Sequence, residues 1–365
     1  MGKLDIRLLD AASQRFGDAV LDPSVWTDIL EQVCQAAATT GASLLQSDVR
    51  TPDVPMTDGA KEIITTYFQN NLHLNDIRAV RGAPLLLAGA PLVSDSDLFS
   101  TEQDMLRDPL YAHVNRYGFR WWAAVGFRSG SALWGLALQR RTVESAFDSH
   151  EKKALAGLSK RLTETSTLSK AVGRQVISGM TNALQLIRQA AVAMDRFGRI
   201  LDVNESAASL FNSEIHVRNR RLFVSDAEAR SAIHRLVDQI RVTPDTFPLK
   251  LKPIVVRLRK GYPVVIRALA VDGAARNPFL GARVILILSA IGRTAEIDPH
   301  ILIQAFRLTP AEARLAALVI TGLSLEKAAV HLGITRETAR NQLKAVFAKT
   351  GIHRQTELAA LLLKL

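Results

Sequence analysis

Apolar residues near the N-terminus recur at steps of three and four, the spacing of one face of an α-helix. One such run covers residues 4–20 and, after an Asp-Pro break at residue 22, a second covers residues 25–37. Residues 42–45 are predicted to form a strand, and residues 59–72 a further helix. The start of the chain is therefore expected to be rich in helix.

Two apolar runs, residues 121–127 and 132–139, flank the short segment Arg-Ser-Gly-Ser. Apolar runs on either side of a short, Gly-containing segment predict a β-hairpin. Helices around such a hairpin indicate an antiparallel sheet covered on one side, which is the plan of a small-molecule sensor domain. We therefore expect an α/β sensor-like domain over residues 1–148.

Residues 149–188 contain no proline and predict one long connecting helix. A spacing of three and four holds along it, although Thr, Ser and Gly occupy several positions of the stripe. Two interpretations stay open: a helix that pairs in a dimer and passes motion between domains, or a helix packed on its own domain. The stripe consists of Leu155, Leu158, Leu162, Thr165, Ser169, Val172, Val176, Gly179, Ala183 and Leu186.

Residues 189–292 predict a third folded region, which contains both strands and helices. The stretch 189–211 predicts a strand, a turn, a second strand and the start of a helix, and another helix follows at 227–241. Two strands across a Lys-Gly turn at 253–272 and a last strand at 282–290 complete the series. The order is two strands, helices, and then three strands.

The C-terminal region predicts three helices with well-marked ends. Thr309 suits the N-cap of the first helix, and Glu312 three residues later completes a capping box. Ser324 caps a second helix that Gly333 ends, and Thr335 caps a third, longer one. A short helix, a Gly-centred turn and a longer helix form a helix-turn-helix.

The third of these helices, residues 336–350, has two chemically different faces. Its apolar residues recur at three- and four-residue steps and should pack on the first two helices. Its other face carries Arg336, Arg340, Asn341 and Lys344. Such side chains can donate hydrogen bonds to phosphates and to purine edges in a DNA major groove. A merely solvated polar face is the alternative, and the capped helices and turn that precede this helix argue against it.

This segment resembles the LuxR-type DNA-binding domain over roughly residues 308–362. The shared features are a T-x-x-E start, a G-L-S turn, an L-G-I-T segment and an F-x-K-x-G end. Residues 300–365 would then form an all-α, four-helix domain, whose fourth helix, at residues 356–363, pairs two chains into a dimer. Ala339 stands where the family usually has Val, and Gln342 where it usually has His, so the resemblance does not give the base sequence that is read.

The resemblance also implies roles for individual residues. Base reading falls on Arg340, Asn341 and Lys344. Contacts to the DNA backbone fall on or near Thr335, Arg336, Thr338, Lys349 and Arg354.

The two upstream regions carry looser resemblances. The pattern A-x-D-x-x-G-x-I-x-x-x-N, residues 193–204, is similar to the opening of a PAS domain, which implies a PAS-like α+β domain at 189–292. This region lacks the Cys of a photochemical flavin site, and a lone His, His234, is more typical of an ordinary helical residue than of a haem ligand. No metal or cofactor is therefore expected here.

The N-terminal region resembles sensor domains of the GAF or autoinducer-binding type. An unknown small-molecule ligand would then bind a pocket of aromatic and polar residues. Core aromatics and surface charges are the equally open alternative. The candidate pocket residues are Tyr67, Asp76, Arg78, Trp121 and Trp122.

Composition narrows the partners and the compartment. The 365 residues carry a net charge of +11, and residues 300–365 contain nine Lys and Arg against four Glu, so an anionic partner is favoured. The single cysteine, Cys34, excludes an internal disulfide and fits a core position in a reducing compartment. Without a long apolar run or a signal-like start, the chain is expected to be cytoplasmic and free of the membrane.

We therefore expect a multidomain α+β regulator of transcription without enzyme activity, dimeric, with double-stranded DNA as partner and RNA polymerase as a further candidate. A sensor histidine kinase is the first alternative, because His150 opens the long helix, but no Gly-rich phosphate loop follows. A σ-factor-like promoter reader would need an upstream helical polymerase-binding domain. A receiver domain would need paired acidic residues at the end of an N-terminal strand.

Overall fold

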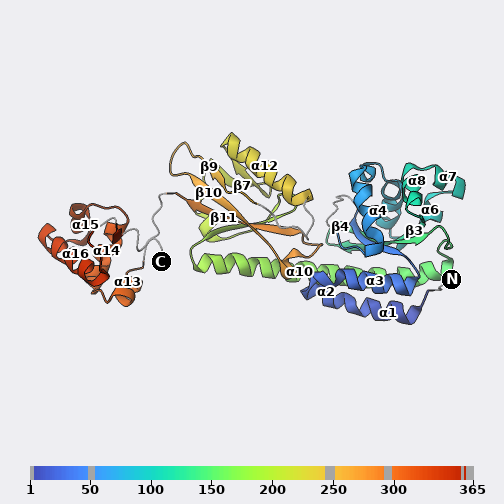
Figure 1. Ribbon diagram of the computed structural model, residues 1–365, viewed down its shortest axis with the longest axis horizontal. Helices are drawn as coiled ribbons and strands as arrows, with labels where there is room; N and C mark the ends of the chain where they lie inside the picture. Colours follow the sequence, from blue (N-terminus) through green and yellow to red (C-terminus); the bar gives the residue numbers. More distant parts are fainter. Residues whose placement is uncertain (1–3, 48–53, 243–250, 292–297, 355–356, 359–365) are drawn as a thin grey trace. The chain divides into compact units, whose positions relative to one another are not determined.

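The chain forms two compact units, residues 1–289 and 290–365. In the first unit the described residues form three β-sheets surrounded by helices, and in the second every element described after residue 298 is a helix. The fold is therefore mixed α and β. The computed structural model describes residues 4–47, 54–242, 251–291, 298–354 and 357–358 (Figure 1).

A four-stranded antiparallel sheet in the order β1-β4-β3-β2 forms the base of the N-terminal region. Its strands are β1 (Gly41–Gln46), β2 (Leu92–Ser94), β3 (Phe119–Ser129) and β4 (Ala132–Arg141). β3 and β4 form the predicted hairpin, and β1 matches the predicted strand. Gly130 in the hairpin turn has a φ of +63°, a left-handed conformation that glycine adopts without strain.

Helices cover both faces of this sheet, so the expectation of a single covered face was wrong. α3 (Trp26–Ala37) and α10 (Leu158–Leu186) pack on one face, and α1 (Ile6–Gln14) packs on α3. Elements that include α4 (Asp58–Gln69) and α8 (Pro109–Arg116) cover the other. The physical reason is that β3 and β4 carry buried apolar residues at odd and even positions alike, so neither face can be left to solvent.

Short helical segments join these elements. They are η1 (Arg15–Gly17), α2 (Asp18–Leu21), η2 (Pro23–Val25), η3 (Leu72–Leu74), the π-helical turn η4 (Arg78–Gly82), α5 (Ala83–Leu87), α6 (Asp95–Leu98) and α7 (Glu102–Arg107). Cys34, on α3, is buried in the core below the sheet, as predicted.

The predicted connecting helix is two helices, α9 (Ser149–Ala156) and α10, separated at Gly157. The expectation of one uninterrupted helix was therefore wrong in detail, although Gly157 keeps right-handed helical angles (φ −59°, ψ −23°) between the two helices. The predicted stripe is buried as far as Ser169. Beyond Ser169 its residues are no longer buried, and Leu186 is 86% exposed. α10 packs on the first sheet and then on the second, which supports packing on its own chain. Its buried residues are Leu158, Leu162, Thr165, Ser166, Ser169, Gly173, Ile177 and Thr181.

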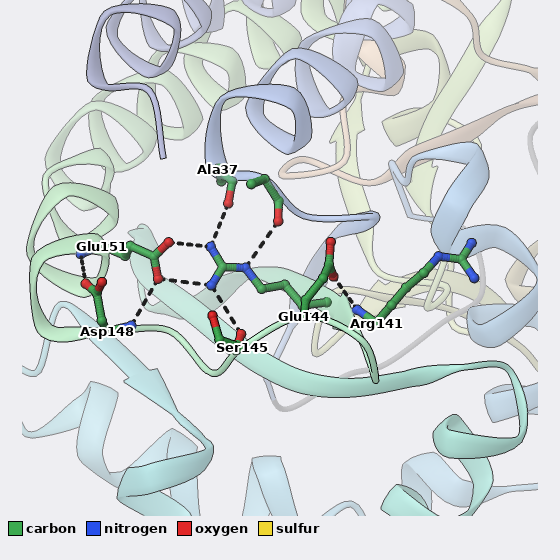
Figure 2. A network of polar contacts seen from close by, with 8 residues as sticks. Ala37, Arg141, Glu144, Ser145, Asp148 and Glu151 are labelled. Atoms are coloured by element: carbon green, nitrogen blue, oxygen red, sulfur yellow. Dashed lines mark hydrogen bonds and ion pairs between the residues drawn. The ribbon is translucent and has the colours of Figure 1, made fainter. Parts of the chain in front are cut away.

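A buried ion pair joins the first sheet to α9. Arg140, near the end of β4, donates to both carboxylate oxygens of Glu151, at 2.7 and 3.0 Å, and to the carbonyl oxygen of Ala37 at 2.9 Å (Figure 2). The Glu151 carboxylate also accepts the backbone N–H of Asp148, which closes the capping box of α9. A bidentate guanidinium–carboxylate pair is directional, so it fixes the angle at which α9 leaves the sheet.

The second sheet has five strands in the order β6-β5-β11-β10-β9, and its β6–β5, β5–β11 and β10–β9 pairs are antiparallel. Its inner face packs against α11 (Glu205–Ala208) and α12 (Ala227–Val242), and α10 covers the outer face. The hairpin of β7 (Ile215–Arg218) and β8 (Arg221–Val224) was not predicted. The five strands are β5 (Ala190–Asp195), β6 (Ile200–Val203), β9 (Ile254–Val256), β10 (Val264–Ala270) and β11 (Ala282–Ala290).

A loop of the second sheet reaches into the core of the first. After η5 (Gly273–Arg276), the ring of Phe279 packs edge-on against Trp26, Phe127 and Trp134, with ring centroids 5.1–5.9 Å apart. The amide of Asn277 donates to the carbonyl oxygen of Ser169 on α10 at 3.0 Å. The two sheets therefore share an aromatic cluster as well as a helix.

The C-terminal unit contains α13 (Pro299–Phe306), α14 (Pro310–Ile320), α15 (Leu325–Leu332) and α16 (Arg336–Thr350). The last three match the predicted helices, and the sequence pattern did not predict α13. Its Leu302 is buried against α14 and α16. Most of the fourth helix expected at residues 356–363 lies outside the described residues, apart from Glu357 and the buried Leu358.

Candidate nucleic-acid interface and ligand pocket

The turn between α15 and α16 is built as its sequence predicts. The hydroxyl of Ser324 accepts the backbone N–H of Lys327 at 3.3 Å and begins α15. Gly333 ends that helix with a φ of +67°, and the hydroxyl of Thr335 accepts the N–H of Thr338 at 3.1 Å to begin α16. Because each end is fixed by a local hydrogen bond or a left-handed glycine, the turn has a defined geometry.

The inner face of α16 is packed on the other helices of the unit. Ala339 and Val346 are fully buried, Ala339 against α14 and α15 and Val346 against α13 and α14. This burial fixes the rotation of α16 about its axis. The opposite face must then point to solvent.

That opposite face carries the predicted base-reading residues. Arg340, Asn341 and Lys344 are all exposed, and within the described part of the chain none of them has a hydrogen-bond or ion-pair partner. Arg340 and Lys344 lie one helical turn apart and so share a face. The structure therefore presents two cations and a carboxamide together on one helix surface.

The residues predicted to contact the DNA backbone have different surroundings. Arg336 is exposed and forms an ion pair with Glu326 at 2.8 Å, and the hydroxyls of Thr335 and Thr338 lie 2.8 Å apart at the start of α16. Arg354 is exposed beyond the end of α16. These four lie at the surface of the unit, where a phosphate can approach.

Lys349 differs from that group because its ammonium is committed to Glu312 at 2.7 Å. Glu312 is the buried acid of the α14 capping box, and it also accepts the backbone N–H of Thr309 at 2.8 Å. Burial raises the pKa of the Glu312 carboxyl, but the Lys349 ammonium and the Thr309 N–H outweigh it and hold the pKa below its usual value. Lys349 therefore ties α16 to α14.

The N-terminal region contains a cavity of about 60 Å³ between the first sheet and the helices around α4. Of the five residues predicted to form a pocket, Tyr67, Asp76, Arg78 and Trp122 line this cavity. Trp121 does not. It lines a separate cavity of about 190 Å³, and its indole N–H donates to the carbonyl oxygen of Glu144 at 2.8 Å.

A polar network runs beside the smaller cavity. The Tyr67 hydroxyl donates to Asp76 at 2.7 Å, and Asp76 also accepts the backbone N–H of Arg78 at 2.7 Å. The Arg78 guanidinium donates to the Tyr111 hydroxyl at 3.2 Å and lies over the rings of Tyr111 and Trp122. Tyr111 in turn donates to Asp95, the fifth titratable group of the network.

Burial dominates the electrostatics of this network. It raises the pKa of the Asp95 carboxyl to about 6, against the opposing effects of the Arg78 cation and the Tyr111 hydroxyl. Burial also raises the pKa of Tyr111, so its hydroxyl stays protonated and able to donate. Sequence reasoning missed both residues, because Asp95 fits the acidic first turn of a short helix and Tyr111 fits an apolar helix face.

Nowhere among the described residues do three His, Cys, Asp or Glu side chains gather as ligands for a metal ion. None of their helices combines the length and the apolar character needed to cross a membrane.

Comparison with known proteins adds little to this picture. No protein-family model matches the sequence, and no curated protein matches it. The chain is similar to the phage VqmA–DPO complex, with a TM-score of 0.23 at 14% identity over 51% of this chain and 87% of that chain. It is also similar to the E. coli DhaR(N)–DhaL complex, with a TM-score of 0.25 at 13% identity over 77% of this chain and 87% of that chain. A Vibrio cholerae VqmA dimer without target DNA, described in relation to LuxR-type receptors, gives a TM-score of 0.19 at 12% identity over 50% of this chain and 86% of that chain. Scores this low support neither a common fold nor a common function.

Proposed function

We propose that this chain is a DNA-binding regulator of transcription, in which α15 and α16 form a LuxR-type helix-turn-helix. The observation that carries the proposal is the surface of α16. Arg340, Asn341 and Lys344 are exposed and unpartnered among the described residues, while the opposite face is packed into the unit. A rigid helix with such side chains on one face suits the width of a major groove.

The roles divide by chemistry. Phosphate contacts from Arg336 and the hydroxyls at the start of α16 would supply much of the affinity and its salt dependence. Arg340 and Lys344 suit the acceptor atoms of guanine, and Asn341 suits the adjacent donor and acceptor of adenine. A dimer would place two such helices on a two-fold symmetric site. Activation or repression through RNA polymerase would follow from where that site lies.

The upstream regions are proposed as the sensory part. The buried network of Tyr67, Asp76 and Arg78 beside an otherwise largely apolar cavity supports a small-molecule pocket in the N-terminal domain. The strand order β6-β5-β11-β10-β9 and the helices between β6 and β9 support a PAS-like second domain. Its inner face is filled by apolar side chains from α12 and the sheet, so we propose that it holds no cofactor.

The test begins with fragmented genomic DNA. The purified protein is mixed with the fragments across a salt series, and the retained DNA is sequenced for a recurrent, near-palindromic motif. Binding to that motif is then compared among the wild type, Arg340→Ala, Lys344→Ala and the control Arg314→Ala. Arg314 is an exposed cation of α14, so its loss changes the net charge by the same amount.

We expect Arg340→Ala and Lys344→Ala each to weaken specific binding by about 1–3 kcal/mol and to leave the thermal unfolding midpoint unchanged. Arg314→Ala should bind nearly as well as the wild type. Unchanged binding by both α16 variants would refute the assignment of this helix face.

A further inference from the structure

A third cavity lies beside α10 and the second sheet. Its volume is about 260 Å³. α10, β6, the turn between β7 and β8, and the loop before β11 each contribute to its wall. The lining residues are Arg174, Gln175, Ile177, Ser178, Leu201, Asp202, Arg220 and Leu280.

The cavity is positively charged. Arg174 and Arg220 line it from different elements, and Lys170 lies one turn before Arg174 on α10. Among the residues that the structure describes, none of these three cations is paired with a carboxylate. Burial lowers the pKa of Lys170, and the guanidinium groups of Arg174 and Arg220 lower it further, so the three cations are close enough to repel one another.

The conformation of Arg220 is unusual. Asn219 and Arg220 form the turn of the β7–β8 hairpin with φ values of +50° and +57°. Asn-Gly is the favoured pair for a turn of this kind, because glycine alone adopts the left-handed region without cost. Here an arginine stands at the second position, and its Nε donates to the carbonyl oxygen of Ile200 at 3.4 Å. Backbone strain of this kind is concentrated at functional sites.

The remaining wall defines what else a ligand would need. Ile177, Leu201 and Leu280 supply an apolar floor. Asp202 is the one acid that lines the cavity in the described part of the chain, and it accepts a hydrogen bond from the Thr181 hydroxyl. The cations can bind the acidic group of a ligand, and the neighbouring carboxylate can then accept a hydrogen bond from a hydroxyl group of the same ligand.

From this arrangement we propose that the cavity between α10 and the β7–β8 turn binds a small organic anion, a carboxylate or a phosphate ester that also carries a hydroxyl group. Arg174 and Arg220 hold the acidic group, and Asp202 accepts the hydroxyl. The ligand joins α10 to the β7–β8 hairpin. This site is independent of the pocket in the N-terminal domain and of the DNA-binding helices.

The test uses the full-length protein and two probes, inorganic phosphate and citrate, which separate phosphate from hydroxy-carboxylate recognition. Calorimetry measures the affinity, and thermal unfolding measures stability with and without the anion. The variants are Arg174→Gln and Arg220→Gly. The matched control is Arg218→Gln, because Arg218 is an exposed arginine of the same hairpin that does not line the cavity.

We expect saturable binding of at least one probe to the wild type and to Arg218→Gln, and at least about tenfold weaker binding to the two cavity variants. Without an anion, Arg220→Gly should unfold at the same temperature as the wild type or higher, because glycine suits the left-handed turn. A purely structural Arg220 would give the opposite pattern, with a lower unfolding temperature and unchanged anion affinity.

Three further outcomes would overturn the proposal. Equal stabilisation of all four proteins by both anions would mean a general salt effect on a basic protein, and failure of both probes to bind saturably would mean that no anion site exists. Binding of the same proteins to duplex DNA is measured in parallel. Weaker DNA binding by the cavity variants at unchanged anion affinity would assign the cluster to the DNA backbone instead.

Discussion

Replacing Phe279 by alanine tests whether the two sheets of the first unit form one cooperative structure. Phe279 belongs to the loop before β11, yet its ring is buried among residues of the first sheet and α3. It is 6% exposed and meets Trp26, Phe127 and Trp134 edge-on, at ring-centroid distances of 5.9, 5.9 and 5.1 Å. The alanine variant removes all three ring contacts and leaves the backbone loop in place.

The size of the effect follows from the packing. Truncating a buried phenylalanine to alanine costs about 3–5 kcal/mol, and the loss is larger where the surroundings cannot close over the cavity. Here Trp26 is fully buried and its neighbours belong to a sheet, so little collapse is expected. Each edge-to-face pair contributes about 0.5–1.5 kcal/mol beyond its area. We therefore expect a loss in the upper half of the 3–5 kcal/mol range.

The assay is urea unfolding followed by tryptophan fluorescence, since Trp26 and Trp134 both contact the deleted ring. The wild type should lose the structure around both sheets in one transition. In Phe279→Ala the N-terminal sheet should unfold at lower urea than the second sheet, which circular dichroism would resolve as a second step. Phe279→Leu is the control, and it should lose less because leucine refills part of the cavity.

A loss below about 1 kcal/mol in Phe279→Ala, with a single unchanged transition, would refute the reasoning. It would mean that the ring is not packed between the two sheets in solution. An equal loss in the leucine and alanine variants would also contradict it, because the effect would then not depend on the cavity.

Three further predictions concern charged groups. Arg140→Met should destabilise the chain by about 3–5 kcal/mol, because it leaves the buried Glu151 carboxylate unpaired. The control Lys160→Met removes an exposed pair with Glu164 and should cost less than about 0.5 kcal/mol. Chemical denaturation measures both. The pKa of Glu312 in the folded chain lies below its usual 4.5, so the ionised carboxylate stabilises the C-terminal unit above pH 4.5. The wild type should therefore be more stable than Glu312→Gln at neutral pH and lose this extra stability as the pH falls through the folded pKa. Thermal unfolding measured across pH tests this. Burial raises the pKa of Asp95 from 3.8 to about 6, so the protonated carboxyl stabilises the folded chain. This stabilisation is complete below pH 3.8 and is lost as the pH rises through 6. The same thermal measurements should show no such loss in Asp95→Asn.

The C-terminal helices were predictable because their ends depend on short-range chemistry. Thr309, Ser324 and Thr335 cap helices through hydrogen bonds to residues three positions away, and Gly333 ends one with a left-handed φ. Each signal lies within four residues of the structure that it causes. α13 also has a capped start, at Asp298 before Pro299, but the apolar run within its 8 residues is too short to predict a helix.

The N-terminal pocket shows the limit of such reasoning. Trp121 and Trp122 are adjacent on β3, and adjacent side chains of a strand point to opposite faces. Only Trp122 therefore lines the cavity of about 60 Å³, although both border the one of about 190 Å³. A bulge between Phe119 and Trp121 further displaces the register. Asp95 and Tyr111 join Arg78 only through tertiary contacts between distant segments, which no local pattern records.

The covered face of the long helix was predicted incorrectly for a related reason. A three-and-four spacing states that one face of a helix is buried, but not what covers it. Leu158 and Leu162 pack on the first sheet of the same chain and Ile177 on the second. After Ser169 the buried positions are Gly173, Ile177 and Thr181, which are not those of the predicted stripe. A dimer contact along α10 would have to use the face that remains exposed.

Arg336 and Lys349, at the two ends of α16, differ in the ion pair that a bound phosphate would have to displace. Arg336 is 75% exposed, and its pair with Glu326 lies in water, where such a pair contributes about 0.2–1 kcal/mol. A phosphate can therefore take Arg336 from Glu326 at little cost. Lys349 is paired with a carboxylate that is 11% exposed and belongs to a capping box, so withdrawing it would leave a buried charge. Under the proposed function, Arg336 would therefore contact the DNA backbone, and Lys349 would act through the position of α16.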